Sequence, residues 1–135
     1  MTKEEIAAVL ADHKAWLKGN GGKRAYLDGA YLAGAYLARA YLDGANLAGA
    51  NLDGAKINDK TAIGILRRAM RSDGYEFFLW HCQEGYFIKA GCRFLDMEAA
   101  RQHWLNTRQG TALGNESLDI LDFFDAAIKR QEASQ

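Results

Sequence analysis

The chain repeats itself every five residues from position 25 to position 59. The segment reads AYLDG, AYLAG, AYLAR, AYLDG, ANLAG, ANLDG and AKIND, with alanine first and leucine or isoleucine third in every unit. An α-helix repeats about every 3.6 residues and a flat strand every two, so a period of five fits neither. First and third residues point the same way on a short extended piece, and glycine closes five of the seven units, where a turn is needed. The pattern predicts a solenoid with a narrow interior of alanine and leucine.

This pattern resembles the pentapeptide-repeat family, and the resemblance implies a right-handed β-helix with four faces per coil. Seven units make fewer than two coils, which is about 10 Å of height at the usual ~4.8 Å spacing. So short a solenoid needs caps, which we expect the flanking segments to supply. The alternative, an amphipathic helix, would contain five glycines that each cost about 1 kcal/mol relative to alanine.

Tyrosine occupies the second slot of the first four units, an outward position on four consecutive faces. Phenol rings are apolar in body and polar at the tip, a composition common at interfaces. We expect these rings to form an interaction surface that supports a homo-oligomer, unless flanking segments cover them. The four residues are Tyr26, Tyr31, Tyr36 and Tyr41.

The segment before the repeat has the pattern of an amphipathic helix. Thr2 and Glu5 have the spacing of a capping box, apolar residues follow at helical spacing, and Gly19 ends the run. We expect this helix to cover an end of the solenoid, with His13 and Trp16 packed in the cap. The stretch "DHKAWLKGNGGKRAYLDGAYL" also resembles the start of short pentapeptide proteins from phages and prophages.

The segment after the repeat has the signals of a small α/β unit. Residues 61–70 are consistent with a strand or a helical turn, and a turn is expected at Ser72-Asp73-Gly74. "YEFFLWHC" and "YFIKAGCRF" predict a β-hairpin. Asp96 is expected to cap a helix from about 97 to 107, and Ser117 a last helix to about 130. Residues 72–104 resemble a module that accompanies pentapeptide repeats in bacterial and phage proteins, and the resemblance implies no known chemistry.

These signals predict a mainly β protein with an α+β part, in three segments. Residues 1–19 would form a capping helix, residues 20–60 the short quadrilateral β-helix, and residues 61–135 the α/β module with a hairpin and two helices.

One cluster in the last segment has the composition of a ligand site. Arginine supplies a bidentate clamp for anions and aromatic rings supply stacking surfaces, so the set suits a nucleotide-like ligand. The alternative is an ordinary core with an arginine on its rim. The predicted ligand-binding residues are Arg93, His103, Trp104, Tyr75, Trp80 and Tyr86. Three further arginines, Arg67, Arg68 and Arg71, are interpreted as a solvated face.

Catalytic and metal sites are not expected. His81 and Cys82 are neighbours on a predicted strand and would point to opposite faces, so they cannot form a nucleophile–base pair. Cys92 and His103 could approach each other, but no Asp or Asn can be placed behind the histidine. The cysteines and histidines lack the paired spacing of metal ligands. We therefore expect no enzyme activity, cofactor or metal.

Composition limits the partners. Seventeen basic residues balance seventeen acidic ones, which argues against bulk attraction to nucleic acid, so direct nucleic-acid binding is not expected. No apolar run reaches the ~20 residues of a membrane helix, and the start lacks a secretory signal, so we expect a cytoplasmic protein of a bacterial host with reduced cysteines.

The sequence is consistent with three candidate functions. The first is a non-enzymatic binding protein that contacts itself, a host protein or a small nucleotide-like ligand. The second is a phage counter-defence protein that sequesters a nucleotide-like signal. The third is a mimic of DNA, as in family members that bind DNA gyrase, although this solenoid is short and carries only four aspartates.

Overall fold

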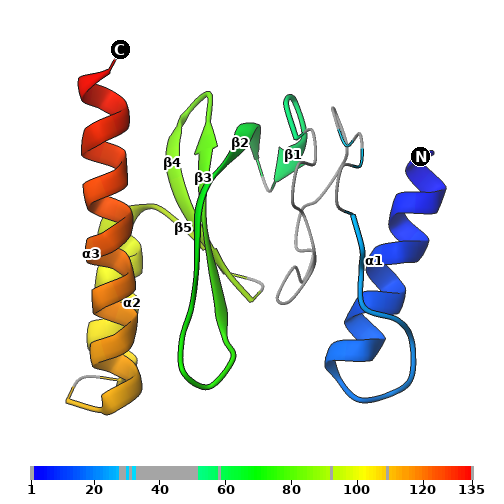
Figure 1. Ribbon diagram of the computed structural model, residues 1–135, viewed down its shortest axis with the longest axis horizontal. Helices are drawn as coiled ribbons and strands as arrows, with labels where there is room; N and C mark the ends of the chain where they lie inside the picture. Colours follow the sequence, from blue (N-terminus) through cyan, green and yellow to red (C-terminus); the bar gives the residue numbers. More distant parts are fainter. Residues whose placement is uncertain are drawn as a thin grey trace. The chain divides into compact units, whose positions relative to one another are not determined.

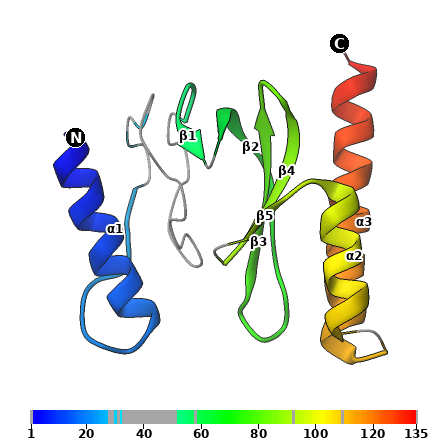
Figure 2. The same cartoon turned by 180° about the vertical axis from the view of Figure 1, so that it is seen from behind.

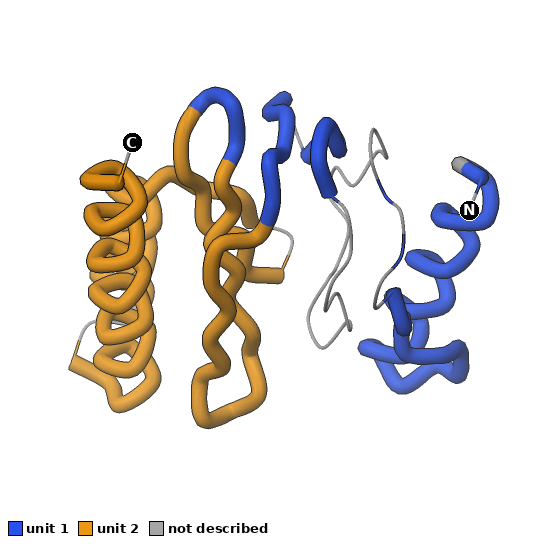
Figure 3. The backbone as a smooth tube through the Cα atoms, turned by 45° about the horizontal axis from the view of Figure 1, so that its top comes forward, with its two compact units in different colours: residues 1–64, 82–84 blue, residues 65–81, 85–135 orange. Residues whose placement is uncertain are grey.

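The computed structural model describes residues 2–27, 30, 32, 52–57, 59–91, 93–108 and 110–134. The chain forms two compact units (Figure 3). The first unit contains Met1–Gly64 and Cys82–Glu84, and the second contains Ile65–His81 and Gly85–Gln135. Each unit is described here by itself.

The first unit begins with helix α1, Lys3–Leu17 (Figure 1). The predicted capping box is confirmed, since the Thr2 hydroxyl accepts from the Glu5 N–H and the Glu5 carboxylate accepts from the Thr2 N–H. These bonds satisfy N–H groups that the first turn of a helix leaves without partners. After Leu17 the chain turns through Gly19, whose φ is 72°, and runs back alongside α1.

The described part of the repeat has the predicted inward and outward slots. Tyr26, in an outward slot, is 66% exposed. The Ala30 N–H donates to Leu27 O and the Ala55 N–H donates to Leu52 O, each at 3.0 Å. A turn therefore follows the leucine in each of these two pentapeptides. Tyr31, Tyr36 and Tyr41, and with them most of the predicted coil, lie outside the described residues. The inward alanine, leucine and isoleucine residues that are buried are Ala25, Leu27, Leu32, Leu52, Ala55 and Ile57.

The end of the repeat pairs with a strand. Strand β1, Lys56–Ile57, is antiparallel to β2, Lys60–Met70. Just before β1, the Gly54 N–H donates to Ala62 O and the Ala62 N–H donates to Ala55 O, and Ala62 is fully buried. Residues 61–70, which the sequence allowed to be a strand or a helical turn, therefore belong to a strand. The first half of this strand hydrogen-bonds to backbone groups at the end of the repeat.

The remaining strands are β3, Glu76–Cys82, β4, Gly85–Ala90, and β5, Arg93–Leu95, and the strand order is β1-β2-β3-β4-β5. The predicted hairpin is confirmed as β3 and β4. Its second half was expected as one strand through "YFIKAGCRF", which is wrong. Gly91 has a φ of 59°, a conformation that favours glycine, and the turn there separates β4 from the antiparallel β5.

Helices α2, Met97–Arg108, and α3, Ala112–Ala133, lie side by side and cover one face of β4 and β5 (Figures 1 and 2). The Ala99 N–H donates to the Asp96 carboxylate, which confirms the predicted cap of α2. Alternate residues of β3 and β4 meet the helices because neighbouring side chains on a strand face opposite ways. The core of this unit includes Phe77, Leu79, Ile88, Ala90, Ala100, Trp104, Leu121, Phe124 and Ala127.

The predicted cap of α3 is wrong. Ser117 was expected to begin this helix, but the helix begins at Ala112, and the Thr111 hydroxyl accepts from the Gly114 N–H. Ser117 is fully buried within the helix, where its hydroxyl donates to Leu113 O. A serine inside a helix can make this bond to the preceding turn, so a cap residue alone does not fix where a helix starts.

Candidate functional site

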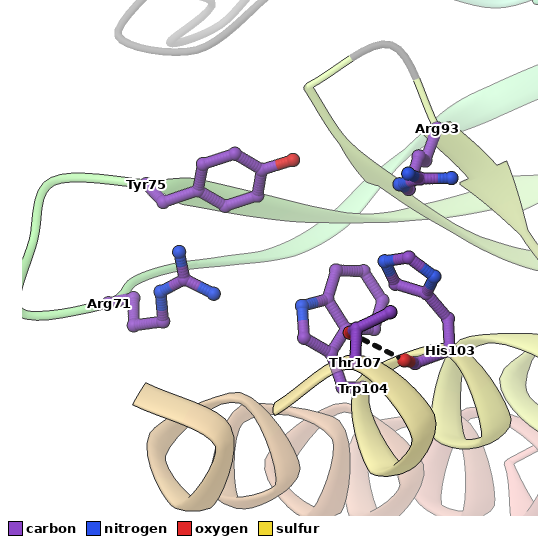
Figure 4. Close-up of a pocket in the computed structure, with 6 residues that line it drawn as sticks. All are labelled: Arg71, Tyr75, Arg93, His103, Trp104 and Thr107. Carbon is purple, nitrogen blue, oxygen red and sulfur yellow. Dashed lines mark hydrogen bonds between the residues drawn. The ribbon is translucent and has the colours of Figure 1, made fainter. Parts of the chain in front are cut away.

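The second unit contains an open pocket of about 460 Å³. It lies where the end of β2, the start of β3, β5 and α2 come together (Figure 4). The Tyr75 ring faces α2 across the pocket, and the His103 ring lies below the Arg93 guanidinium. The six lining residues are Arg71, Tyr75, Arg93, His103, Trp104 and Thr107.

The structure brings together four of the six predicted ligand-binding residues, namely Arg93, His103, Trp104 and Tyr75. The other two, Trp80 and Tyr86, do not line this pocket. Trp80 alternates with the core-facing Leu79 along β3 and is fully buried on the other side. Tyr86 is stacked on His81, with ring centroids 4.7 Å apart, and burial raises the pKa of its phenol.

Arg71 was interpreted as part of a solvated face, and this was wrong. Its side chain is 3% exposed and lines the pocket. Arg67 is exposed, while Arg68 forms an ion pair with Glu76 at 2.8 Å. Thr107 was also missed. The Arg-Ser-Asp-Gly order at the strand end was the signal for Arg71, because a carboxylate two residues on can fold back onto the guanidinium across a turn.

The Arg71 guanidinium is held from three sides. Its Nε and Nη2 donate to the two Asp73 carboxylate oxygens at 2.9 and 2.8 Å, and its Nη1 donates to the Ser117 hydroxyl at 3.1 Å. The same guanidinium lies 4.7 Å from the Tyr75 ring centroid. The Arg71 hydrogen bond lowers the pKa of Asp73 to about 2 and raises the pKa of Arg71. Because Asp73 compensates its charge, Arg71 acts as a fixed wall of the pocket beneath Tyr75.

Two further contacts fix the position of this wall. Ser72 donates its N–H and its hydroxyl to the two Glu116 carboxylate oxygens, at 3.1 and 2.7 Å, which ties the turn to α3. A Cβ added at Gly91 would lie 2.7 Å from the Tyr75 hydroxyl oxygen, so the absence of a side chain there leaves room for that hydroxyl. The pocket is therefore preorganised on its Tyr75 side.

The other side of the pocket combines a cation with an uncharged imidazole. Burial, and then the positive charge of Arg93, lower the pKa of His103 below its ordinary value near 6.5. His103 is therefore mostly neutral at pH 7. The Thr107 hydroxyl donates to the His103 backbone oxygen at 2.7 Å. Arg93 is exposed at the rim, and no carboxylate is present among the six lining residues. This composition favours an anion, which would also favour the protonated form of His103.

Trp104 contributes less stacking surface than the sequence predicted. It is 3% exposed, and its ring lies 4.9 Å from the Phe77 ring in the core. The His103 ring meets it edge to face at 4.6 Å. The Trp104 ring thus packs against the side of the His103 ring. Tyr75 is more exposed than Trp104.

The structure also bears on the cysteines and on metal binding. Burial, and then the Glu84 charge, raise the pKa of Cys82 to about 12, so its thiol stays protonated at neutral pH. Cys92 lies outside the described residues. Within the described ranges, no group of three or more His, Cys, Asp or Glu side chains could hold a metal ion. No helix among these residues is long and apolar enough to cross a membrane.

Comparison with known proteins characterises one segment of the chain. Residues 23–59 match the family model of pentapeptide repeats, with eight copies. The match starts two residues before the seven units read from the sequence and ends at the same position. No curated protein and no solved structure matches the chain.

Proposed function

We propose that this is a non-enzymatic binding protein whose second unit recognises a small anionic, nucleotide-like ligand in the pocket at Arg93 and His103. The observation that carries the proposal is the composition of this preformed pocket, in which the exposed Arg93 lies beside His103 and none of the six lining residues is a carboxylate. An arginine at the rim attracts and orients an anion. The Tyr75 ring offers a surface for the remainder of the ligand.

Binding rather than turnover is favoured by the state of the polar groups. The Thr107 hydroxyl donates to a backbone oxygen rather than to the imidazole, so it is not activated by the adjacent histidine. The Cys82 thiol is buried and protonated. The resemblance to short phage proteins supports a phage setting, in which sequestering a nucleotide-like signal of the host would be a counter-defence function.

Thermal unfolding in the presence of adenosine monophosphate, inorganic phosphate and adenosine tests this proposal. A ligand at about a hundred times its Kd adds about 2.7 kcal/mol of stability. We expect a shift with adenosine monophosphate, a smaller one with phosphate and none with adenosine. Arg93→Gln should remove these shifts. Arg67→Gln is the matched control, because Arg67 is an exposed arginine of the same unit whose guanidinium donates to the adjacent Leu66 O. Equal shifts in wild type and Arg93→Gln would overturn the proposal.

A second proposal is self-association through the repeat, in keeping with the exposed ring of Tyr26. Interfaces are enriched in tyrosine, whose ring can be buried while its hydroxyl remains hydrogen-bonded. Light scattering after size exclusion should give a mass above the monomer that falls in Tyr26→Ser. A clean monomer at high micromolar concentration would contradict it.

A further inference from the structure

Helix α3 has an exposed stripe on the side that faces away from the core. Its buried side chains, among them Leu121, Phe124 and Ile128, belong to the core beneath it, and α2 lies beside it (Figures 1 and 2). Five exposed residues follow one another in alternate steps of four and three, which is the spacing of the seam between two paired helices. These residues, the outer stripe, are Asp119, Phe123, Ala126, Arg130 and Ala133.

The centre of the outer stripe is apolar. Phe123 is 45% exposed, and the small Ala126 follows three residues later on the same face. A ring beside a small side chain leaves room for a second ring, and aromatic residues are enriched in the cores of protein interfaces. A single exposed ring is ordinary on a protein surface, so the inference depends on the charges around it.

The outer stripe carries opposite charges on either side of its apolar centre, at Asp119 and Arg130. Arg130 is in the last turn, where a cation suits the helix dipole, but Asp119 lies well inside α3, where the dipole gives no reason for it. Neither residue forms an ion pair with another residue that the structure describes. The charges that flank the stripe are paired within the chain, Arg101 with Asp122 at 2.9 Å and Lys129 with Asp125 at 3.1 Å.

This order of residues is complementary to itself in the antiparallel direction. If two copies of α3 run antiparallel about a two-fold axis between positions 124 and 125, position 119 of each copy lies opposite position 130 of the other. Positions 123 and 126 lie opposite each other in the same arrangement, because both pairs are centred on the same point of the helix. A parallel pair would instead oppose two aspartates and two arginines, and like charges disfavour it.

We propose that the outer stripe of α3 binds a second copy of this chain as an antiparallel helix pair. Each Phe123 ring packs on the partner subunit's Ala126, and each Asp119 pairs with the partner subunit's Arg130. A two-fold axis makes every such contact twice, and one register satisfies both the apolar and the charged pairs, which favours a second copy over an unrelated partner.

The contact should be weak and concentration-dependent. The outer stripe extends over about four turns of helix. One pair of such helices buries less than the ~1,600 Å² of a standard interface. The stripe is separate in sequence from Tyr26 and from the six residues of the pocket, so each surface can be tested with the others intact.

Sedimentation equilibrium of the full chain carrying Tyr26→Ser measures this contact without a contribution from the Tyr26 ring. We expect a monomer–dimer equilibrium at high micromolar concentration. Phe123→Ser, which removes the aromatic anchor from both sides of the axis, should raise the dissociation constant at least about a hundredfold. Met70→Thr is the matched control, because it removes a 59% exposed apolar side chain of the same unit from β2 and should change nothing.

Exchanging the two charges tests the antiparallel register. Asp119→Arg brings two arginines together at each end of the pair, and Arg130→Asp brings two aspartates together. Each variant alone should therefore dimerise at least about tenfold more weakly. In an equal mixture of the two variants, every contact between unlike chains again joins an acid to a base. With a fluorophore on one variant, the mixture should form a heterodimer about as tight as the parent dimer.

Three outcomes would overturn the proposal. The first is a monomeric Tyr26→Ser parent at high micromolar concentration, which would assign any association of the wild type to the repeat. The second is an unchanged dissociation constant in Phe123→Ser. The third is a mixture that associates no more tightly than its components, and loss of folding cannot imitate restoration on mixing. Thermal shifts with adenosine monophosphate that persist in Phe123→Ser keep this test separate from that of the pocket.

Discussion

The two units each contain a histidine ring against a tryptophan ring, and the two pairs are arranged in opposite ways. In the first unit His13 is buried and Trp16 is exposed, with the rings stacked. In the second unit Trp104 is buried and His103 lines the pocket, with the rings edge to face. The same two residue types therefore leave an indole partly exposed in one place and an imidazole at the edge of a polar pocket in the other. Burial decides which member is available to a partner.

The largest expected effect is the loss of stability on truncating Trp104, which we compare with the small loss expected on truncating Trp16. Trp104→Ala removes a ring packed on Phe77 and should lower the free energy of unfolding by about 3–5 kcal/mol. Trp16→Ala should cost less, about 1 kcal/mol, because its side chain is 42% exposed. Chemical denaturation measures both. Similar losses would mean that the two indoles are equally buried and that the comparison fails.

The histidines should show the reverse order. His13→Ala leaves the Ala25 N–H buried without its acceptor, which costs about 1–3 kcal/mol. His103→Ala should cost under about 1 kcal/mol, since its ring lines an open pocket. Faster hydrogen exchange at the Ala25 amide in His13→Ala would locate the effect. Unchanged exchange there would show that the bond does not hold α1 to the repeat.

A third prediction concerns the wall of the pocket. Asp73→Asn removes the countercharge of Arg71 and should destabilise the fold by about 1–2 kcal/mol, less than for a fully buried pair because Asp73 is partly exposed. The folded-state pKa of Asp73 is about 2, below its ordinary 3.8. Its contribution is therefore fully present above pH 4 and is lost as the pH falls towards 2.

Acid titration of both proteins tests this assignment. The wild type should lose more stability than Asp73→Asn between pH 4 and pH 2. Parallel curves would mean that the Arg71–Asp73 pair contributes nothing to folding. The first unit offers a control, because Thr2→Ala weakens the cap of α1 without touching this pair.

The smallest expected effect is a pH dependence of ligand binding. The pKa of His103 is lowered in the free protein, and a bound anion would raise it, so binding takes up a proton. The phosphate of adenosine monophosphate also takes up a proton in this range, so the comparison is with His103→Gln, in which only the ligand titrates. Relative to that variant, the wild type should gain affinity as the pH falls from 7 to 5, by at most about tenfold per unit. His103→Gln should remove the dependence attributable to the imidazole. A profile identical to wild type would exclude it from the site.

The sequence by itself determined the features that depend on local chemistry. The five-residue period predicted which side chains are buried in the described part of the repeat, because residues two apart on an extended segment point the same way. Thr2 and Asp96 cap their helices as expected, and the hairpin of β3 and β4 lies where the alternation placed it. Four of six pocket residues were found because arginine, histidine and aromatic residues recur close together in the chain.

Only the tertiary structure decided the features that depend on partners distant in sequence. Arg71 is in the pocket because Ser117, 46 residues away, accepts one of its hydrogen bonds. Ser117 lies inside α3 rather than at its start, and Gly91 has no side chain that would displace the Tyr75 hydroxyl. The exposure of Trp16 and the burial of Trp104 also follow from packing. A side chain's solvent contact depends on every segment that packs around it, and local sequence cannot specify those segments.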